Sequence, residues 1–450
     1  MKNIKSAEQE ILKGSSRLIN ENQKPFDRVE YMNKFMHLNK AYIYKSKENK
    51  TNKEELLKKF KQDYKNYRDR WINISKLYLD ENNFKSDSKL LPPLSIDIET
   101  AAICDLACPH CSREYIVTPD KIMNFSTYKK LVDEAANLGV PSIKLNWRGE
   151  PLLNPKLNEF VIYAKRKGIM EVSINTNAVT LSENKSKELI EAGLDIIIFS
   201  FDGGTKETYE KMRPGRFQKN NFEKVYENIK KFSQIKKEMK YKFPITKIQM
   251  ILTKDSRNEK ENFFKLFSPI LDDVTVTQYN ERGGSISDLS DTQQEKIQKY
   301  LKNNNLDSKT PYMVNINEEI FISRKRKPCE QIFQRLMVTY NGRVGMCCHD
   351  WGAQHGVGFV DKESFEKDQK EFLSIKEKID KNKKGFELLK EAKIPKNYNE
   401  PEHKVESLKD IWKGAELSSV RELHYNDKVN KLNVCKNCTF KDTYSWEKIN

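Results

Sequence analysis

Between residues 94 and 283 the chain alternates short apolar runs with longer amphipathic stretches. The runs are rich in β-branched residues, as buried strands are, and the stretches between them carry apolar residues at helix spacing. This alternation predicts β–α units repeated around a parallel sheet. Strands are expected at residues 94–100, 142–149, 171–178, 195–202, 246–253 and 273–280. Six units are two short of a closed eight-stranded barrel, so the predicted fold class is α/β with a partial (β/α)6 TIM barrel.

The regions on either side of this core have different patterns. The N-terminal part is polar and lysine-rich, with an apolar stripe at helix spacing, and Pro92 and Pro93 end it. Five of the eight cysteines lie after residue 328, where Asn341 and Gly342 fit a type I′ hairpin turn. The expected domains are a helical basic N-terminal extension (1–90), a barrel core (91–284), a helical connector (285–328) and a small cysteine-containing C-terminal domain (329–450).

Composition excludes several classes of protein. No apolar run approaches the roughly 18 residues of a spanning helix, and no secretory signal opens the chain, so a cytoplasmic protein without a transmembrane segment is expected. There a disulfide framework is not favoured, and the eight cysteines indicate metal binding instead. The net charge is +16, but lysines are scattered without an arginine–aromatic cluster, so nucleic acid is not an expected partner.

Three cysteines follow the first predicted strand in the sequence CDLACPHC: Cys104, Cys108 and Cys111. Three thiolates on one loop can bind three irons of a cubane cluster and leave the fourth iron open for a small molecule. A structural zinc site is the alternative for such a spacing.

This CxxxCxxC motif after strand one closely resembles that of the radical S-adenosylmethionine (radical SAM) enzymes. The resemblance implies a [4Fe-4S] cluster whose open iron is chelated by SAM, which is cleaved to methionine and a 5′-deoxyadenosyl radical. His110 replaces the aromatic residue usual in the family before the third cysteine, and is expected to stack on adenine or to hydrogen-bond it.

Further candidates for SAM binding close the later strands. The sequence WRGEP, with Gly149, Glu150 and Pro151, resembles the Gly-Glu-Pro motif of the family, in which Glu150 would accept from the SAM ammonium. The third and fourth strands end in groups suited to ribose hydroxyls, namely Asn175, Asn177, Ser200 and Asp202. Ordinary turn formation is an equally good interpretation of each of these four residues taken singly.

The second cysteine set resembles a "twitch" domain, the shortened form of the SPASM extension in radical SAM enzymes. The resemblance implies one auxiliary [4Fe-4S] cluster held by Cys329, Cys347, Cys435 and Cys438. The spacing from Gly342 favours Cys347 over the adjacent Cys348 as ligand. Tetrahedral zinc is the alternative for four thiolates.

The overall pattern is most similar to radical SAM/twitch enzymes of carbohydrate and surface-polysaccharide biosynthesis. It implies hydrogen abstraction from a sugar or sugar nucleotide, with oxidation or epimerisation of a carbinol carbon, and a reducing partner such as flavodoxin or ferredoxin. Candidates to position substrate or move its proton are Arg213, Arg216, Tyr279 and Glu281, each equally a salt-bridge or packing residue. Alternatives are a peptide-, protein- or RNA-modifying radical SAM enzyme, and a non-catalytic iron–sulfur or zinc scaffold.

Overall fold

The computed structural model was analysed for the residues whose placement is defined. These are residues 26–48, 52–78, 90–111, 113, 120–278, 291–306, 312–314, 319–326, 329–350, 353, 355–361, 363, 366, 405–436, 438 and 444–449. Within them, no helix combines the length and apolarity that a membrane crossing requires.

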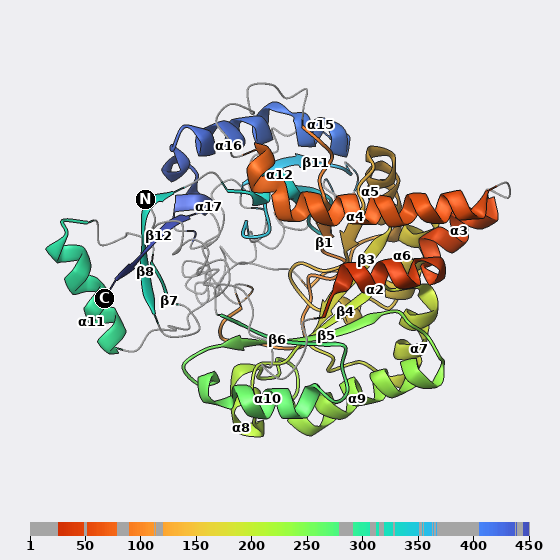
Figure 1. Ribbon diagram of the computed structural model, residues 1–450, viewed down its shortest axis with the longest axis horizontal. Helices are drawn as coiled ribbons and strands as arrows, with labels where there is room; N and C mark the ends of the chain where they lie inside the picture. Colours follow the sequence, from red (N-terminus) through yellow and green to blue (C-terminus); the bar gives the residue numbers. More distant parts are fainter. Residues whose placement is uncertain are drawn as a thin grey trace, which may run out of the picture.

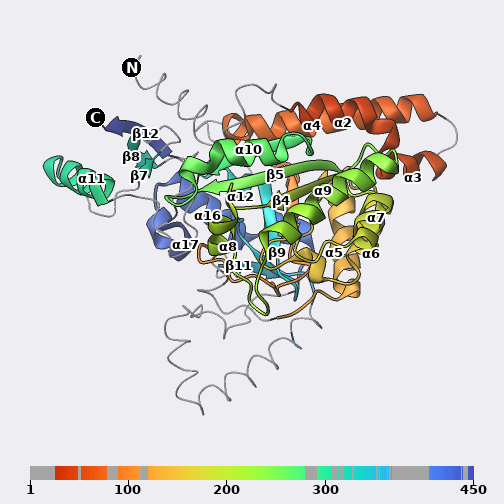
Figure 2. The same ribbon diagram turned by 90° about the horizontal axis from the view of Figure 1, so that it is seen from below.

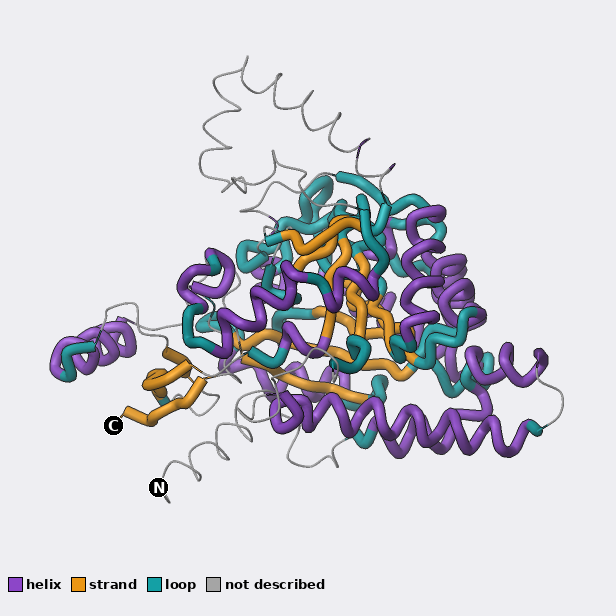
Figure 3. The backbone as a smooth tube through the Cα atoms, turned by 90° about the horizontal axis from the view of Figure 1, so that it is seen from above, coloured by secondary structure: helices purple, strands orange, loops and turns teal. Residues whose placement is uncertain are grey.

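The core is a parallel sheet with helices around its outside (Figure 1). Its strands are β1 (Ser95–Ile98), β2 (Ser142–Lys144), β3 (Glu171–Thr176), β4 (Ile196–Ser200), β5 (Ile245–Leu252) and β6 (Asp273–Gln278), each parallel to the next. The helices between them are α5 (Phe125–Leu138), α6 (Leu157–Arg166), α7 (Glu183–Ala192), α8 (Lys206–Met212), α9 (Phe222–Glu238) and α10 (Lys260–Phe267). All six predicted strands are present, and the partial-barrel prediction is confirmed. Figure 3 shows the strands gathered in the interior.

Helix ends in this core follow the chain's capping residues. Ser182 accepts from the backbone N–H of Lys185 at the start of α7, and Gly193 ends that helix with a φ of 92°. Gly139 ends α5 in the same left-handed conformation, with a φ of 81°. Glycine adopts this conformation without the penalty of a Cβ, so each helix stops where the chain must turn back to the sheet.

A hairpin from the C-terminal part of the chain extends the same sheet. Strand β9 (Arg335–Val338) pairs in parallel with β1, and β10 (Arg343–Gly345) and β11 (Gly356–Phe359) continue it in antiparallel fashion. The strand order is therefore β11-β10-β9-β1-β2-β3-β4-β5-β6. The predicted type I′ turn is wrong, because only Gly342 has a positive φ, 85°, and a type I′ turn needs two such residues.

The predicted helical N-terminal extension is confirmed within the described residues. Helices α2 (Arg28–Phe35), α3 (Lys40–Glu48) and α4 (Lys53–Tyr78), with the short 3-10 helix η1 (Met36–Leu38), lie together along one side of the molecule (Figure 2). Side chains of α2 and α4 contact the residues that begin β2 and β3. The extension therefore covers the amino end of the sheet, opposite the edge at which functional groups were expected.

The predicted connector is only partly helical. It contains α11 (Asp291–Asn303) but also β7 (Tyr312–Val314) and β8 (Ile320–Arg326), which join β12 (Tyr444–Ile449) in a second, antiparallel sheet. Ile297 and Leu301 of α11 pack on this small sheet. The remaining C-terminal elements of the described residues are the helices α12 (Gln331–Gln334), α15 (Leu408–Lys413), α16 (Ala415–Tyr425), η7 (Val429–Lys431) and α17 (Asn433–Lys436).

Candidate functional site

The first cysteine set lies on the loop that follows β1, at the carboxyl edge of the sheet. Backbone hydrogen bonds tie this loop to the segment after α8: Ala107 N–H donates to the Pro214 carbonyl at 2.9 Å and Arg216 N–H donates to the Asp105 carbonyl at 2.8 Å. Cys111 N–H donates to the Cys108 carbonyl at 2.9 Å, which turns the chain between those two cysteines. The loop that carries the three thiols is thus held by a second loop of the barrel.

Two of these thiols, those of Cys104 and Cys108, are poorly suited to ionise without a metal. Burial raises the pKa of Cys108 to about 12, and burial together with the Glu150 charge raises the pKa of Cys104 well above its ordinary value. In the described part of the chain, no group of three His, Cys, Asp or Glu side chains converges on one metal ion. A cubane binds each thiolate through a different iron and does not require such convergence. Three thiols on one loop, that of Cys108 buried and those of Cys104 and Cys111 partly buried, fit a cluster that displaces their protons.

The WRGEP loop lies directly against the cysteine loop. Gly149 has a φ of 69°, and a Cβ there would lie 2.2 Å from the Ala101 carbonyl oxygen, so only glycine allows this approach. Glu150 caps the short helix η4 (Pro151–Leu153), in which Pro151 is the first residue. The Gly-Glu-Pro sequence therefore shapes a tight turn and buries a carboxylate beside the cysteine loop.

Glu150 is 2% exposed and accepts hydrogen bonds only from neutral donors among the described residues. They are Thr176 Oγ1 at 2.7 Å and the backbone N–H groups of Asn177 at 2.8 Å and Leu152 at 3.0 Å. Burial, reinforced by the charge of Asp105, raises the pKa of Glu150 to about 7 despite these bonds. A carboxylate in this setting is stabilised by a cation, and an ammonium group of a ligand meets that need.

The predicted ribose-binding residues have different surroundings. Asn177 Nδ2 donates to Asp105 Oδ1 at 2.6 Å, so this amide braces the cysteine loop. Asn175 Oδ1 is buried and has no hydrogen-bond partner within the described structure, which leaves an acceptor for a ligand. Ser200 ends β4 beside Gln249 of β5.

Asp202 is fully buried and holds two other candidates in place. Its Oδ2 lies 2.6 Å from Arg213 Nη2 and 3.4 Å from His110 Nε2, and its Oδ1 accepts from Ile251 N–H at 2.8 Å. Burial alone would raise the pKa of Asp202, but the Arg213 charge and the His110 and Ile251 bonds hold that pKa below its ordinary value. Asp202 and Arg213 therefore form a salt bridge, which was the alternative to a substrate-positioning role for Arg213 in the sequence analysis. His110 Nδ1 is buried without a hydrogen-bond partner among the described residues.

Of the other predicted substrate residues, only Arg216 lies within the described part of the chain, and it is more exposed than Arg213. Arg216 Nη1 lies 2.7 Å from Asp120 Oδ1, and this pair is partly exposed. The guanidinium of Arg216 also lies over the ring of Phe217, 4.9 Å from its centroid. Tyr279 and Glu281 lie outside the described residues.

Two contacts between the WRGEP loop and the C-terminal hairpin were not predicted. Arg148 forms a bidentate pair with the buried Glu99, with Nε–Oε1 at 2.5 Å and Nη2–Oε2 at 2.9 Å, and Tyr340 N–H donates to the same carboxylate. Trp147 Nε1 donates to the Cys348 carbonyl at 3.2 Å. Glu99 lies next to the last residue of the first predicted strand (94–100). A charged residue at a strand end was the signal that could have indicated a role for it. These bonds join the first cysteine site to the second.

The second cysteine set is gathered from several elements. Cys329 precedes α12, Cys347 follows β10 and Cys435 lies on α17, and all three are buried. Burial, together with the charges of Cys348, Cys435, Asp350 and Cys329, raises the pKa of Cys347, so these groups lie within electrostatic reach of it. Cys438 N–H donates to the Cys435 carbonyl at 3.2 Å. The Cys348 thiol donates to Gln331 Oε1 at 3.2 Å, which gives it a partner outside the set.

Comparison with known proteins identifies the core. Residues 98–266 match the family described as the Radical SAM superfamily. The matched stretch resembles a radical SAM domain, and its cysteine loop fits the cofactors of that family, S-adenosylmethionine and a [4Fe-4S] cluster. The match spans the cysteine loop, the WRGEP loop, the strand-end residues and Arg213.

Curated relatives align over part of their length. A probable GTP 3′,8-cyclase of Methanothermobacter marburgensis is 35% identical over 123 residues, which are 27% of this chain and 40% of the relative. A PqqA peptide cyclase of Gluconobacter oxydans is 33% identical over 122 residues, 27% of this chain and 34% of the relative. The chain thus spans well under two thirds of these relatives.

Solved structures also align with the chain. BtrN in complex with AdoMet and 2-DOIA is 16% identical, with a TM-score of 0.40 over 80% of this chain and 99% of that one. SuiB of Streptococcus suis bound to S-adenosylmethionine is 16% identical, with a TM-score of 0.43 over 65% of this chain and 73% of that one.

Proposed function

We propose that the protein is a radical SAM enzyme that oxidises or epimerises a carbinol carbon of a sugar or sugar nucleotide. The observation that carries the radical SAM part is the buried carboxylate of Glu150, without a cationic protein partner among the described residues, beside a loop of three cysteines. When bound, the cluster and SAM supply a 5′-deoxyadenosyl radical for hydrogen abstraction.

The chain's own residues bind and orient these groups. Cys104, Cys108 and Cys111 hold three irons as thiolates, and the Glu150 carboxylate accepts from the SAM ammonium. Asn175 offers its unpartnered Oδ1 to a ribose hydroxyl. Asp202 fixes the orientation of Arg213 and of His110, whose ring would stack on adenine or hydrogen-bond it.

The second cysteine set would hold one auxiliary [4Fe-4S] cluster through Cys329, Cys347, Cys435 and Cys438. The buried thiols and the Cys348–Gln331 hydrogen bond favour Cys347 as the ligand. Four thiolates leave no open iron for substrate, so an auxiliary cluster there favours net oxidation, with flavodoxin or ferredoxin as the reducing partner of the enzyme.

A second candidate is cyclisation of a nucleotide or a peptide. It is favoured by the names of the relatives, GTP 3′,8-cyclase and PqqA peptide cyclase. Arg216, partly exposed at the carboxyl edge, suits a phosphate or a carboxylate in either reaction.

The test is anaerobic, reductant-dependent release of 5′-deoxyadenosine from SAM, with lysate fractions of low and high molecular mass as sources of substrate. Stimulation by the small fraction, lost in Cys104→Ala, supports a sugar or nucleotide. Stimulation by the large fraction alone supports a peptide, protein or RNA substrate and contradicts the carbohydrate proposal.

Iron content tests the two cysteine sets separately. Two clusters give about eight irons per chain, and the alanine variant of Cys104, Cys108 and Cys111 retains about four. Cys347→Ala is expected to lose about four irons, whereas its neighbour Cys348→Ala, the matched control, retains them. Zinc in place of iron would refute the enzyme proposal.

A further inference from the structure

His424 is a buried side chain between two segments of the second cysteine set. It lies in the last turn of α16 and is 3% exposed. The backbone N–H of Cys329 donates to its Nδ1 at 3.1 Å, and its Nε2 lies 3.4 Å from Cys435 Sγ. Both ring nitrogens therefore contact residues proposed as cluster ligands.

The Cys329 contact determines which nitrogen of His424 carries the proton. A ring nitrogen that accepts from an amide N–H bears no hydrogen, so the neutral imidazole has its hydrogen on Nε2. Nε2 is then the donor toward Cys435, and the sulfur is the acceptor. The backbone amide of Cys329, one proposed ligand, thus orients the hydrogen bond that His424 makes to Cys435, another proposed ligand.

The helix that carries His424 is anchored next to Cys329. Arg421, three residues earlier and fully buried, donates from Nε to the Ile332 carbonyl at 3.2 Å and from Nη1 to the Trp412 carbonyl at 2.8 Å. Its guanidinium lies over the Trp412 ring, 4.5 Å from the centroid. Positions three apart share a helix face, so Arg421 fixes α16 on the face that presents His424.

We propose that His424 is a positioning residue of the auxiliary cluster, donating a hydrogen bond from Nε2 to the Cys435 thiolate. This inference rests on the proposed function, since it takes the second cysteine set to bind an iron–sulfur cluster. Hydrogen bonds to cluster sulfurs disperse the negative charge that increases on reduction, and so raise the reduction potential. His424 therefore makes the auxiliary cluster easier to reduce.

The first test detects the hydrogen bond of His424 in a protein that retains this residue. In the full-length variant with Cys104, Cys108 and Cys111 changed to alanine, the auxiliary cluster is reduced and studied by pulsed electron paramagnetic resonance after labelling with ¹⁵N-histidine. A weak ¹⁵N coupling, typical of a hydrogen-bonded ring, is expected, and because all six histidines carry the label it should disappear in His424→Leu. A strong coupling would mean that histidine ligates iron, and no coupling would mean that it is distant; either result overturns the proposal.

Substitutions provide the second test. His424→Leu is expected to lower the midpoint potential of the auxiliary cluster, and His424→Gln, which retains a donor near the Nε2 position, to restore part of the shift. His37→Leu, at an exposed histidine of η1, is the control and should leave the potential unchanged. An unchanged potential in His424→Leu overturns the role of His424. If the parent variant binds no iron, the proposed auxiliary cluster itself fails, and this inference with it.

Discussion

Two buried glutamates at opposite ends of the sheet have pKa values shifted in opposite directions. Glu171 begins β3 at the amino end and Glu150 follows β2 at the carboxyl end; they are 3% and 2% exposed. Burial would raise the pKa of Glu171, but the charges of Arg28 and Arg68 and bonds from Arg28 and Tyr64 hold that pKa below its ordinary value. Burial raises the pKa of Glu150 to about 7, because its donors are neutral.

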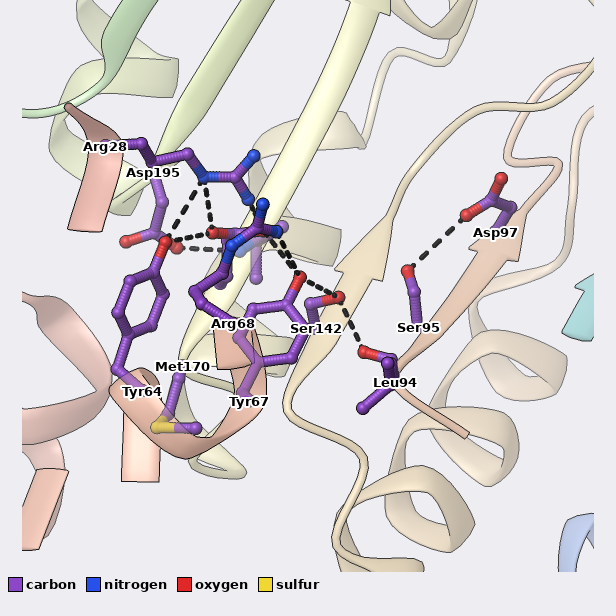
Figure 4. Close-up of polar contacts among 12 residues, drawn as sticks. Arg28, Tyr64, Tyr67, Arg68, Leu94, Ser95, Asp97, Ser142, Met170 and Asp195 are labelled. Carbon is purple, nitrogen blue, oxygen red and sulfur yellow. Dashed lines mark hydrogen bonds and ion pairs between the residues drawn. The ribbon is translucent and has the colours of Figure 1, made fainter. Parts of the chain in front are cut away.

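The buried carboxylates of the amino end, Glu171 and Asp195, have cationic partners within the protein. Figure 4 shows Arg28 of α2 and Tyr64, Tyr67 and Arg68 of α4 gathered beside Ser142. Nearby, the buried Asp195 accepts from Asn39, Lys165 and Val172, each at 2.7 Å. At the carboxyl end, buried atoms of Asp105, His110 and Asn175 have no hydrogen-bond partner within the described structure. The difference separates an end built for stability from an end built to receive a ligand.

The largest expected effect comes from removing the cation at the amino end. Arg28→Met leaves the Glu171 carboxylate buried without its nearest charge. The free energy of unfolding, from urea denaturation, should fall by about 3 kcal/mol, at the low end for a broken buried pair because the Arg28 side chain is 32% exposed. Adding Glu171→Gln should recover part of the loss. A double variant no more stable than Arg28→Met would contradict this account.

The complementary change at the carboxyl end should affect ligand binding more than folding. Glu150→Gln removes the charge proposed to pair with the SAM ammonium, and SAM binding should weaken by about 100-fold, as expected for a lost buried charge-assisted bond. Anaerobic equilibrium dialysis measures this effect. Glu188→Gln, at an exposed glutamate of α7, is the control. Equal affinities of Glu150→Gln and the unaltered protein would remove Glu150 from the SAM site.

Acid should loosen the amino end first. Since the pKa of Glu171 is lowered in the folded protein, its stabilising contribution is present above the unfolded value of 4.5 and is lost as pH falls through the lower folded pKa. The protection factors of the α2 and α4 amides, which correct for the intrinsic pH dependence of exchange, should therefore fall below about pH 4.5, and Glu171→Gln should flatten that dependence. Protection factors of α2 and α4 that stay constant with pH in the unaltered protein would show that Glu171 does not hold the extension.

The smallest expected effect is that of a single hydroxyl. Tyr67 donates to Ser142 Oγ and Glu171 Oε1, both at 3.2 Å, so Tyr67→Phe should lower the free energy of unfolding by about 1 kcal/mol. Tyr226→Phe, at a half-buried tyrosine of α9, is the matched control in the same urea titration. A loss as large as that of Arg28→Met would mean that hydroxyls rather than charge stabilise this end.

The sequence predicted local features well. Strand periodicity located all six barrel strands, and the cysteine spacing with Gly149 and Glu150 located the stretch that matches the Radical SAM superfamily, because these signals lie within a few consecutive residues. The Asp202–Arg213 pair also lies within one β–α unit, and the salt bridge was one of the two interpretations open for Arg213.

Contacts between distant segments were not predictable in the same way. Arg28 and Glu171 are 143 positions apart, and nothing in the local pattern of either residue indicates the other. His424 was missed because a lone histidine on an apolar helix face carries no signal until α16 is placed against Cys329. The pairing of β9 with β1 likewise depends on the closure of the whole fold and not on the composition of either strand.

The continuous sheet has a consequence for how the chain is made. Strand β1 needs β9 as its second neighbour, and Asp97 and Arg335 in these strands are 238 positions apart. At about 5–20 residues per second, a ribosome takes roughly 10 to 50 seconds to bridge that separation. During this time one edge of β1 is unpaired, and the cysteine loop that follows β1 lacks its contacts with the C-terminal hairpin. Iron–sulfur assembly on this chain is therefore expected after translation has passed the hairpin.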